Sequence, residues 1–288
     1  RTVLGIELDG LGIVAHSVNI FFRAPDLMSL HDKGWAKFYR MIDDTGCWAE
    51  LIAIDGVELW RLTVFHELSA DMDAEAYLRK AVGGDLDCEV IDASPWERRD
   101  YVAREYVRGR VFIAGDAAHQ NSPTGGLGMH TGIIEAGNLA WKLQAVLAGW
   151  GGPDLLASYP TECRPVATRN VELSTGSFSQ ITSLPGAATA ADHLVDGGRR
   201  LTGLTISEQT RTQYCYDDSP ICVFDGTPPP LDTGRFVPSA RPGTRAPHAW
   251  IDAETSTLDL FGAGFVLLRL GAAPPDATAL ARAAETAG

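Results

Sequence analysis

One segment constrains this chain more than any other, because residues 110–148 contain four successive kinds of sequence. Residues 110–115 form a short apolar run that predicts a buried strand entering a turn. Residues 121–128 read Asn-Ser-Pro-Thr-Gly-Gly-Leu-Gly and cannot form regular structure. From about residue 129 to 148, apolar residues recur at helical spacing. The segment therefore predicts a strand, an acidic turn, a glycine-rich loop and the N-terminus of a long helix.

This arrangement of elements has a chemical meaning. Small residues let the backbone approach a flat ligand closely. The unpaired N–H groups of a helix start favour negative charge on that ligand, by about 0.3–1 kcal/mol at an exposed site. Asp116, in the acidic turn, offers acceptors to hydroxyl groups. The segment predicts a polar ligand with hydroxyls and an electron-rich edge, without naming it.

The N-terminal part of the chain predicts a β-sheet built mainly from hairpins. Residues 3–66 are rich in alternating apolar residues between turn signals such as Asp44-Thr45-Gly46 and Asp55-Gly56. One helix is expected at 73–82, ending at a glycine pair. The expected strands cover residues 35–42, 48–54, 57–65, 86–93 and 100–107. The fold class is therefore α+β or α/β, with a mostly antiparallel sheet.

The second half of the chain predicts helix and then irregular structure. Helix is expected through 154–180, interrupted by Pro160 and Pro165. Residues 183–200 and 226–247 are rich in Gly, Pro, Ala and Thr, which is typical of a connector. The tail carries a strand-like run at 265–270 and an Ala-rich stretch that predicts a final helix.

Composition excludes some classes of protein. Lys+Arg 24 against Asp+Glu 37 gives a net charge of −13, which argues against a nucleic-acid partner. No apolar run approaches the roughly 20 residues that a membrane span needs. The five cysteines are odd in number and scattered, and no signal peptide precedes them, so reduced thiols in the cytoplasm are expected.

Residues 110–148 resemble the second flavin-binding motif of the class A flavoprotein monooxygenases, the aromatic hydroxylases related to p-hydroxybenzoate and phenol hydroxylase. The resemblance continues through Tyr159, Glu162, Arg164 and Pro165. Residues 19–24 and Tyr101-Val102 resemble the substrate-domain strands of that family, and residues 234–250 resemble the entry to a thioredoxin-like domain. The resemblance implies four parts: a substrate-binding sheet domain at 1–107, the C-terminal part of an FAD-binding domain at 108–182, a connector at 183–247, and a partial thioredoxin-like domain at 248–288.

The same resemblance implies FAD as cofactor and NAD(P)H as co-substrate. Asp116 is expected to accept a hydrogen bond from the ribityl chain, and Pro123 to lie beside the isoalloxazine, near the substrate, as the catalytic position. The backbone N–H groups of Met129 and His130 are expected to face the pyrimidine carbonyl. His130 stands where the family usually has Asn. The full set of expected cofactor-binding residues is Gly115, Asp116, Pro123, Gly125, Gly126, Leu127, Gly128, Met129 and His130.

The family's first flavin element, a G-x-G-x-x-G sequence in a βαβ unit, does not occur in this sequence. The nearest candidate, Gly10 to Ala15, fits G-x-G-x-x-A but runs into a strand-like stretch, so we expect it to be a hairpin turn. The resemblance then implies that about the first third of such an enzyme lies outside this chain, in an N-terminal segment or a second chain.

The sequence thus predicts a fragment of an FAD-dependent monooxygenase that hydroxylates an aromatic, phenolic or polyketide-like substrate with NAD(P)H and O2. Two other classes stay open. One is a catalytically silent remnant that binds an aromatic ligand without redox chemistry. The other is a metal-dependent hydrolase that uses Asp116 and His119, with His130 as a third ligand. Assembly into a homo-oligomer is also left open.

Overall fold

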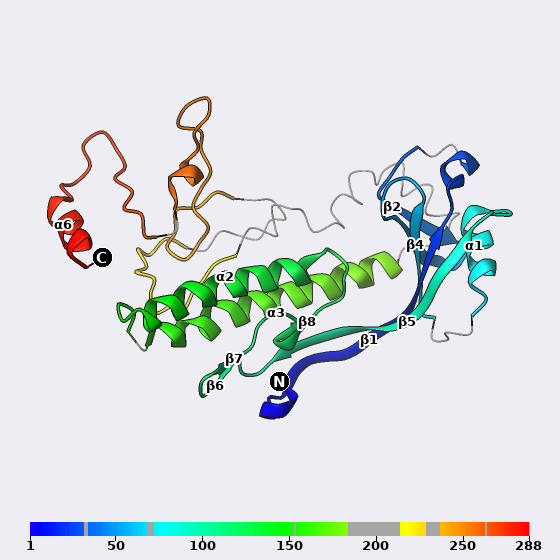
Figure 1. Cartoon of the computed structure of the whole chain (residues 1–288), viewed down its shortest axis with the longest axis horizontal. Coiled ribbons are helices and arrows are strands. Elements are labelled where there is room, and N and C mark those ends of the chain that lie inside the picture. Colours follow the sequence, from blue (N-terminus) through cyan, green and yellow to red (C-terminus); the bar gives the residue numbers. More distant parts are fainter. Residues whose placement is uncertain are drawn as a thin grey trace. The chain divides into compact units, whose positions relative to one another are not determined.

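The computed structural model describes residues 1–31, 34–67, 72–152, 154–183, 214–228, 237–262 and 264–287 (Figure 1). The chain divides into two compact units. The first unit contains Arg1–Ile134 and Arg164–Ser207, and the second contains Glu135–Cys163 and Glu208–Gly288. Two long helices run across this division: α2 (Leu127–Leu147) begins in the first unit, and α3 (Asp154–Thr182) begins in the second.

The first unit is built on a six-stranded sheet in which every neighbouring pair is antiparallel. The order across the sheet is β2-β3-β4-β1-β5-β8, and Figure 1 shows the two longest strands, β1 and β5, running side by side. This confirms the predicted antiparallel sheet. The strands are β1 (Leu8–Arg23), β2 (Phe38–Asp43), β3 (Gly46–Ala53), β4 (Leu59–Phe65), β5 (Glu89–Ala103) and β8 (His119–Gln120).

The remaining elements are short. Helix α1 (Ala74–Val82) lies between β4 and β5 in the chain, and a two-stranded ribbon of β6 (Val107–Arg108) and β7 (Val111–Phe112) follows β5. In the second unit the final helix is α6 (Thr278–Ala287). The 3-10 turns are η1 (Thr2–Leu4), η2 (Leu27–Leu30), η3 (Gly115–Ala117) and η4 (Thr257–Leu260). No described helix is long and apolar enough to cross a membrane.

Local side-chain chemistry explains why the predicted turns and helix form. The carboxylate of Asp55 accepts hydrogen bonds from three successive backbone N–H groups, those of residues 57–59, at 2.9–3.0 Å, which closes the β3–β4 turn. These backbone bonds hold the pKa of Asp55 below its usual value. Asp73 accepts from the N–H of Ala76 and caps α1, while Gly83 ends it with φ 80°. The predicted helix at 73–82 is confirmed.

The two faces of the sheet differ in polarity, because side chains alternate along each strand. The apolar face packs under α1 as the main core, with these fully buried members among others: Val18, Ile20, Phe22, Trp60, Leu62 and Leu78. On the opposite face, neighbouring strands align Asn19 with Thr63, and Thr63 with Glu50. The Thr63 hydroxyl donates to Asn19 at 2.8 Å, and Arg40 pairs with Glu50 at 3.3 Å. The middle of this second face is therefore polar although it is largely buried.

Two expected interruptions are absent. One continuous strand, β5, covers most of the two strands predicted at 86–93 and 100–107 and passes through Pro95. Within the described residues, β8 pairs with β5 only at Tyr101 and Val102. On the side of β5 away from β1, no described strand therefore needs a hydrogen bond from a backbone N–H at Pro95. Helix α3 likewise passes through Pro160 and Pro165. A proline inside a helix costs about 3 kcal/mol, and the buried side chains on both sides offset this cost.

Two other expectations are wrong in detail. The buried strand expected at 110–115 is reduced to β7, in which Val111 is 46% exposed, although Ile113 is buried. The run at 265–270 forms no strand in its described residues, and Phe265 is 82% exposed, because no described strand pairs with it. The predicted C-terminal helix is confirmed as α6. Of the expected connector, residues 184–213 and 229–236 lie outside the described residues.

The G-x-G-x-x-A candidate lies inside β1, so the expected hairpin turn is wrong. Gly10 and Gly12 have φ of 137° and 89°, and the register with β5 shifts between Asp9 and Gly12. This irregularity is a bulge that bends a long strand. A Cβ added at Gly10 would lie 2.1 Å from the Asp100 carbonyl oxygen, so close strand contact requires glycine there. No helix follows the bulge, and it has none of the βαβ context of a dinucleotide site.

In the second unit, the parts of α2 and α3 that belong to it hold a buried ionic cluster. Lys142 Nζ lies 2.5 Å from Glu162 Oε2, and both side chains are almost fully buried, at 0% and 2% exposed. Asn138 Nδ2 donates to the same oxygen, and the Ser219 hydroxyl donates to the other, each at 2.5 Å. The cluster therefore ties residue 219, beyond the helices, to the paired helical segments.

Burial of Cys163 in this unit predicts an alkaline loss of stability. Desolvation raises the pKa of its thiol to about 12, whereas the pKa of a thiol in an unfolded chain is about 8.5. Above that lower pH the unfolded chain binds fewer protons than the native chain, so the free energy of unfolding falls as pH rises. We expect a loss of about 1–2 kcal/mol between pH 8 and 10 from this group. Urea unfolding at both pH values measures it. Cys163→Ala should show a smaller loss, and an equal loss would contradict the assignment.

Candidate functional site

A tight turn after β7 presents Asp116 to solvent. Gly115 adopts φ 56°, a left-handed conformation that favours glycine, and begins the 3-10 turn η3. The N–H of Ala118 donates to the Gly115 carbonyl at 2.8 Å, and the Ala118 carbonyl accepts from the N–H of Ala103 at 2.7 Å. The turn is thus fixed to the end of β5, while the Asp116 side chain remains exposed.

The loop that follows reverses direction through two successive glycines. Gly125 and Gly126 have φ of 86° and 66°, and the N–H of Gly126 donates to the Pro123 carbonyl at 2.9 Å. A side chain at either glycine would be strained. Ser122 is fully buried and anchors the loop, while Pro123 is exposed. The loop therefore presents Pro123 and bare backbone on its outer side.

Helix α2 begins at Leu127, two residues earlier than expected, so Leu127 and Gly128 belong to the helix and not to the loop. Leu127 is buried, whereas Met129 is 72% exposed and His130 is also exposed. His130 Nδ1 donates to the Gly126 carbonyl at 2.7 Å, and the Thr131 hydroxyl donates to the Leu127 carbonyl. The His130 side chain therefore turns back onto the loop, and its backbone N–H lies in the helix's first turn.

Close backbone contact brings the turn and the helix start together. A Cβ added at Gly132 would lie 3.3 Å from Gly115 Cα, and one added at Gly128 would lie 3.2 Å from Asn121 Oδ1. Asn121 Nδ2 donates to Ser174 on α3 at 3.3 Å. The structure thus gathers the predicted site residues 115–116 and 123–130 within the first unit. Their individual contacts with a cofactor stay predictions.

The residues of the alternative metal site differ in their exposure to solvent. His119 is 1% exposed and sits in β8, paired with Val102, whereas Asp116 is exposed. In the described part of the chain, no group of three or more His, Cys, Asp or Glu side chains could hold a metal ion. The geometry gives no support to a metal-dependent hydrolase.

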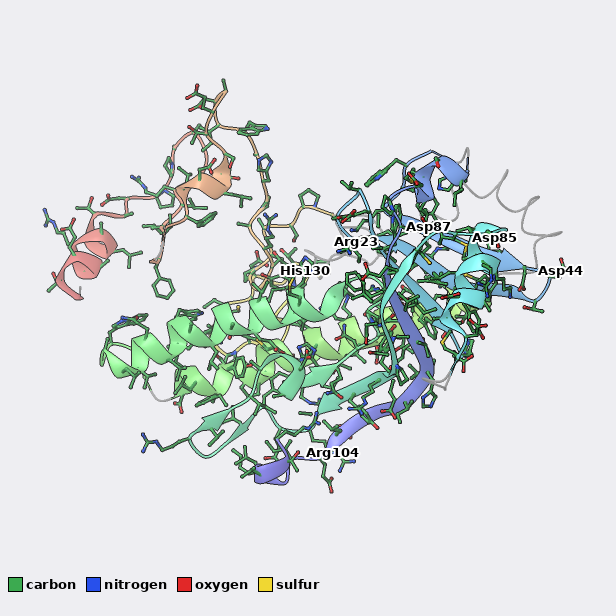
Figure 2. All side chains as sticks on the ribbon, turned by 45° about the vertical axis from the view of Figure 1, so that its right-hand side comes forward. Arg23, Asp44, Asp85, Asp87, Arg104 and His130 are labelled. Carbon is green, nitrogen blue, oxygen red and sulfur yellow. The ribbon has the colours of Figure 1, made fainter. Side chains whose placement is uncertain are left out.

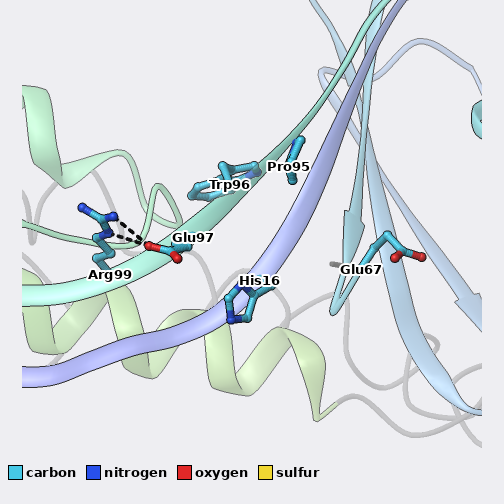
Figure 3. A pocket seen from close by; sticks show the side chains of 6 residues that line it. All are labelled: His16, Glu67, Pro95, Trp96, Glu97 and Arg99. Atoms are coloured by element: carbon cyan, nitrogen blue, oxygen red, sulfur yellow. Dashed lines mark hydrogen bonds and ion pairs between the residues drawn. The ribbon is translucent and has the colours of Figure 1, made fainter. Parts of the chain in front are cut away.

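Two features of the first unit escaped sequence analysis. One is Arg98, a buried arginine on β5 whose guanidinium reaches the loop; alternation along a strand gives no sign of such a partner. The other is an open hollow of about 520 Å³ around His16, Trp96 and Arg99 (Figure 3). Arg99 pairs there with Glu97 at 2.7 Å. None of the predicted site residues lines this hollow.

Comparison with known proteins gives the arrangement a family. Residues 1–174 match the model of an FAD-binding domain. A putative polyketide hydroxylase of Streptomyces halstedii is 35% identical over 299 residues, covering 96% of this chain and 51% of the relative. Tetracenomycin B2 monooxygenase-dioxygenase of Streptomyces olivaceus is 37% identical over 303 residues, covering 100% and 52%. The chain thus spans about half the length of these curated relatives.

Solved structures agree with this match. The rebeccamycin biosynthetic enzyme RebC with reduced flavin superposes with a TM-score of 0.86 at 39% identity, covering 100% of this chain and 56% of that one. A ternary complex of aklavinone-11 hydroxylase with FAD and aklavinone superposes with a TM-score of 0.76 at 27% identity, covering 92% and 49%. Taken with the turn, loop and helix start described above, these matches show that the chain belongs to the FAD-binding domain family, among the class A FAD-dependent aromatic hydroxylases.

Proposed function

We propose that this chain supplies the substrate-binding sheet and the isoalloxazine end of the FAD site of a monooxygenase. The whole enzyme would hydroxylate an aromatic, polyketide-like substrate with NAD(P)H and O2. The observation that carries the proposal is the contact between Gly132 and Gly115, which sets an exposed carboxylate, a glycine loop and a helix start side by side. Relatives named as polyketide hydroxylases support the substrate class.

The residues present fit FAD. Gly125 and Gly126 adopt left-handed conformations and carry no side chain. They therefore leave room for a flat ring to approach the backbone. Asp116 is exposed and free to accept hydrogen bonds from the ribityl hydroxyls. When bound, FAD supplies the redox chemistry, taking electrons from NAD(P)H and activating O2.

The chain's own residues would bind, orient and shield. The backbone N–H groups of Met129 and His130, in the first turn of α2, would stabilise negative charge at the pyrimidine carbonyl. Pro123 offers no N–H donor and would exclude water beside the ring, as the catalytic position. The polar face of the sheet, with Asn19 and Thr63, would orient hydroxyl groups of the substrate.

Other parts of this proposal concern partners and location. The sequence has no G-x-G-x-x-G element, so a cradle for the pyrophosphate would come from a further segment or a second chain. We place the enzyme in the cytoplasm, with self-assembly left as a further possibility to measure. The domain limits at residues 107, 182 and 247 belong to the same proposal. The catalytically silent remnant is not favoured, since the relatives are named as hydroxylases and monooxygenases.

Asp116→Ala in the FAD-binding holoenzyme tests the site. Losing hydrogen bonds to a charged acceptor costs about 1.5–3 kcal/mol, so the dissociation constant of FAD should rise by about tenfold to a hundredfold. Titration of apoenzyme with FAD, followed by flavin fluorescence, gives the constant. Asp44→Ala is the matched control, because Asp44 is an exposed turn aspartate outside the motif (Figure 2). An unchanged FAD affinity in Asp116→Ala would remove the site assignment.

A further inference from the structure

Arg98 reaches from the sheet to the loop that carries Pro123. It lies on β5 and is 3% exposed. Its Nε donates to the Ser17 hydroxyl at 3.1 Å, and its Nη1 donates to the hydroxyls of Ser122 at 3.1 Å and Thr124 at 3.5 Å. The guanidinium therefore joins two strands of the sheet to the residues on either side of Pro123.

Aromatic rings surround the Arg98 charge. Its Cζ lies 4.2 Å from the ring centroid of Phe178, 4.6 Å from Trp96 and 5.3 Å from Phe65. None of the ion pairs found among the described residues includes Arg98. Burial lowers the pKa of this guanidinium to about 10, which still leaves it charged at neutral pH.

This environment is costly if its only purpose is to hold the fold. A buried charge is normally paired with an opposite charge, and an apolar side chain would fill the same ring-lined space without desolvation. Ring faces attract a cation but do not neutralise it. The Glu50 carboxylate acts on the Arg98 charge coulombically without forming an ion pair with it, and Nη1 of Arg98 points to the loop hydroxyls.

We propose that Arg98 is a positioning residue that holds the Ser122–Thr124 loop in place against FAD and favours the reduced, anionic flavin over the oxidised one. The inference rests on the proposed function, because that function places FAD at this loop. Neither the motif nor the comparisons assign a role to Arg98. Hydrogen bonds fix the loop, and the positive charge, for which the described residues provide no ion-pair partner, supplies the preference between redox states.

The test measures the reduction potential and absorption spectrum of FAD in the holoenzyme. Arg98→Met should lower the affinity for reduced relative to oxidised FAD by about tenfold, which corresponds to a potential about 30 mV more negative for two electrons. Arg98→Lys, which keeps the charge, should restore part of the shift. Ser122→Ala combined with Arg98→Met should shift it less than the two separate effects summed, because one hydrogen bond links them.

Arg23→Met is the matched control. Arg23 is the last residue of β1 in the same sheet, and it pairs with Glu58 and Glu89. It is labelled in Figure 2. Its substitution should leave the potential unchanged, although it removes the same charge. A wild-type potential in Arg98→Met, with FAD affinity still lost in Asp116→Ala, would overturn the role of Arg98 alone. Intact FAD affinity in Asp116→Ala would overturn the proposed site and this inference together. If Arg98→Met does not fold, the reduction potentials of Arg98→Lys and Ser122→Ala decide instead. A more negative potential supports the role of Arg98, and a wild-type potential in both variants overturns it.

Discussion

Lys142→Met is expected to destabilise the second unit by about 3–5 kcal/mol, because it leaves the carboxylate of Glu162 buried without its cation. Both side chains are almost completely excluded from solvent, and their charged atoms are 2.5 Å apart. Met has nearly the same length as Lys, so the change removes charge and little volume. Urea unfolding followed by far-UV circular dichroism gives the free energy of unfolding.

A second substitution separates loss of charge pairing from loss of packing. In Lys142→Met with Glu162→Gln, no unpaired charge remains, and the amide at residue 162 keeps an oxygen that can accept from Asn138 or Ser219. We expect the double variant to recover more than half of the lost stability. Arg79→Met removes an exposed i,i+4 pair with Glu75 and should cost only about 0.3–0.5 kcal/mol. A Lys142→Met variant as stable as Arg79→Met would show that the buried pair adds nothing.

The buried cluster around Lys142 and Glu162 gives a structural explanation for part of the family resemblance. Glu162 and Tyr159 were noted only because the resemblance extends through them, and both prove to be buried in the second unit. Arg164 has a different role in the first unit, where its guanidinium donates to the Ala103 carbonyl and to Asp9, each at 3.0 Å. Glu162 and Arg164, which lie beyond the loop, therefore join α3 to other elements of their own units.

Local signals predicted the elements whose ends are set by local chemistry. Helix α1 was predicted with both ends, because Asp73 and Gly83 cap it within a few residues of sequence. The β3–β4 turn was predicted for the same reason, since Asp55 closes it with its own neighbours. Such features need no knowledge of the rest of the fold.

Features set by distant partners could not be predicted in this way. β5 continues through Pro95 because β1 lies beside it along its whole length, and α3 continues through Pro160 because its neighbours in the helix are buried. The run at 265–270 has the composition of a strand but lacks a described partner to pair with. In each case, tertiary contacts decide against the local preference.

In the candidate site, too, some features follow from local sequence and others depend on tertiary contacts. The glycine loop and the exposed Asp116 follow from residue types in one segment, and the structure does gather them. The contact of Gly132 with Gly115 and the reach of Arg98 to Ser122 depend on how strand, loop and helix meet. Nothing in the sequence distinguishes Arg98 from its exposed neighbour Arg99, because only the fold decides which one faces the loop.

Gly10→Ala is expected to destabilise the first unit by about 2–5 kcal/mol, from strain at positive φ and overpacking together. The new Cβ would lie 2.1 Å from the Asp100 carbonyl oxygen at φ 137°. β1 and β5 would have to separate there. The carboxylate of Asp100 accepts from the N–H of Leu11 and, at 2.7 Å, from the Thr175 hydroxyl on α3, so the separation would disturb three elements. Thermal and urea unfolding both measure the loss.

Gly12→Ala is the control that distinguishes a strand bulge from a cofactor cradle. At Gly12 the added Cβ meets only the Tyr101 hydroxyl, at an ordinary 3.6 Å, so strain at φ 89° alone should cost about 1 kcal/mol. If Gly10 and Gly12 formed a dinucleotide cradle, both substitutions would weaken FAD binding with little effect on unfolding. If they form the bulge seen in β1, Gly10→Ala should lose more stability than Gly12→Ala. A folded Gly12→Ala holoenzyme should also keep its FAD affinity. An FAD affinity lost at both positions, with unfolding unchanged, would return this sequence to the role of a nucleotide-binding motif.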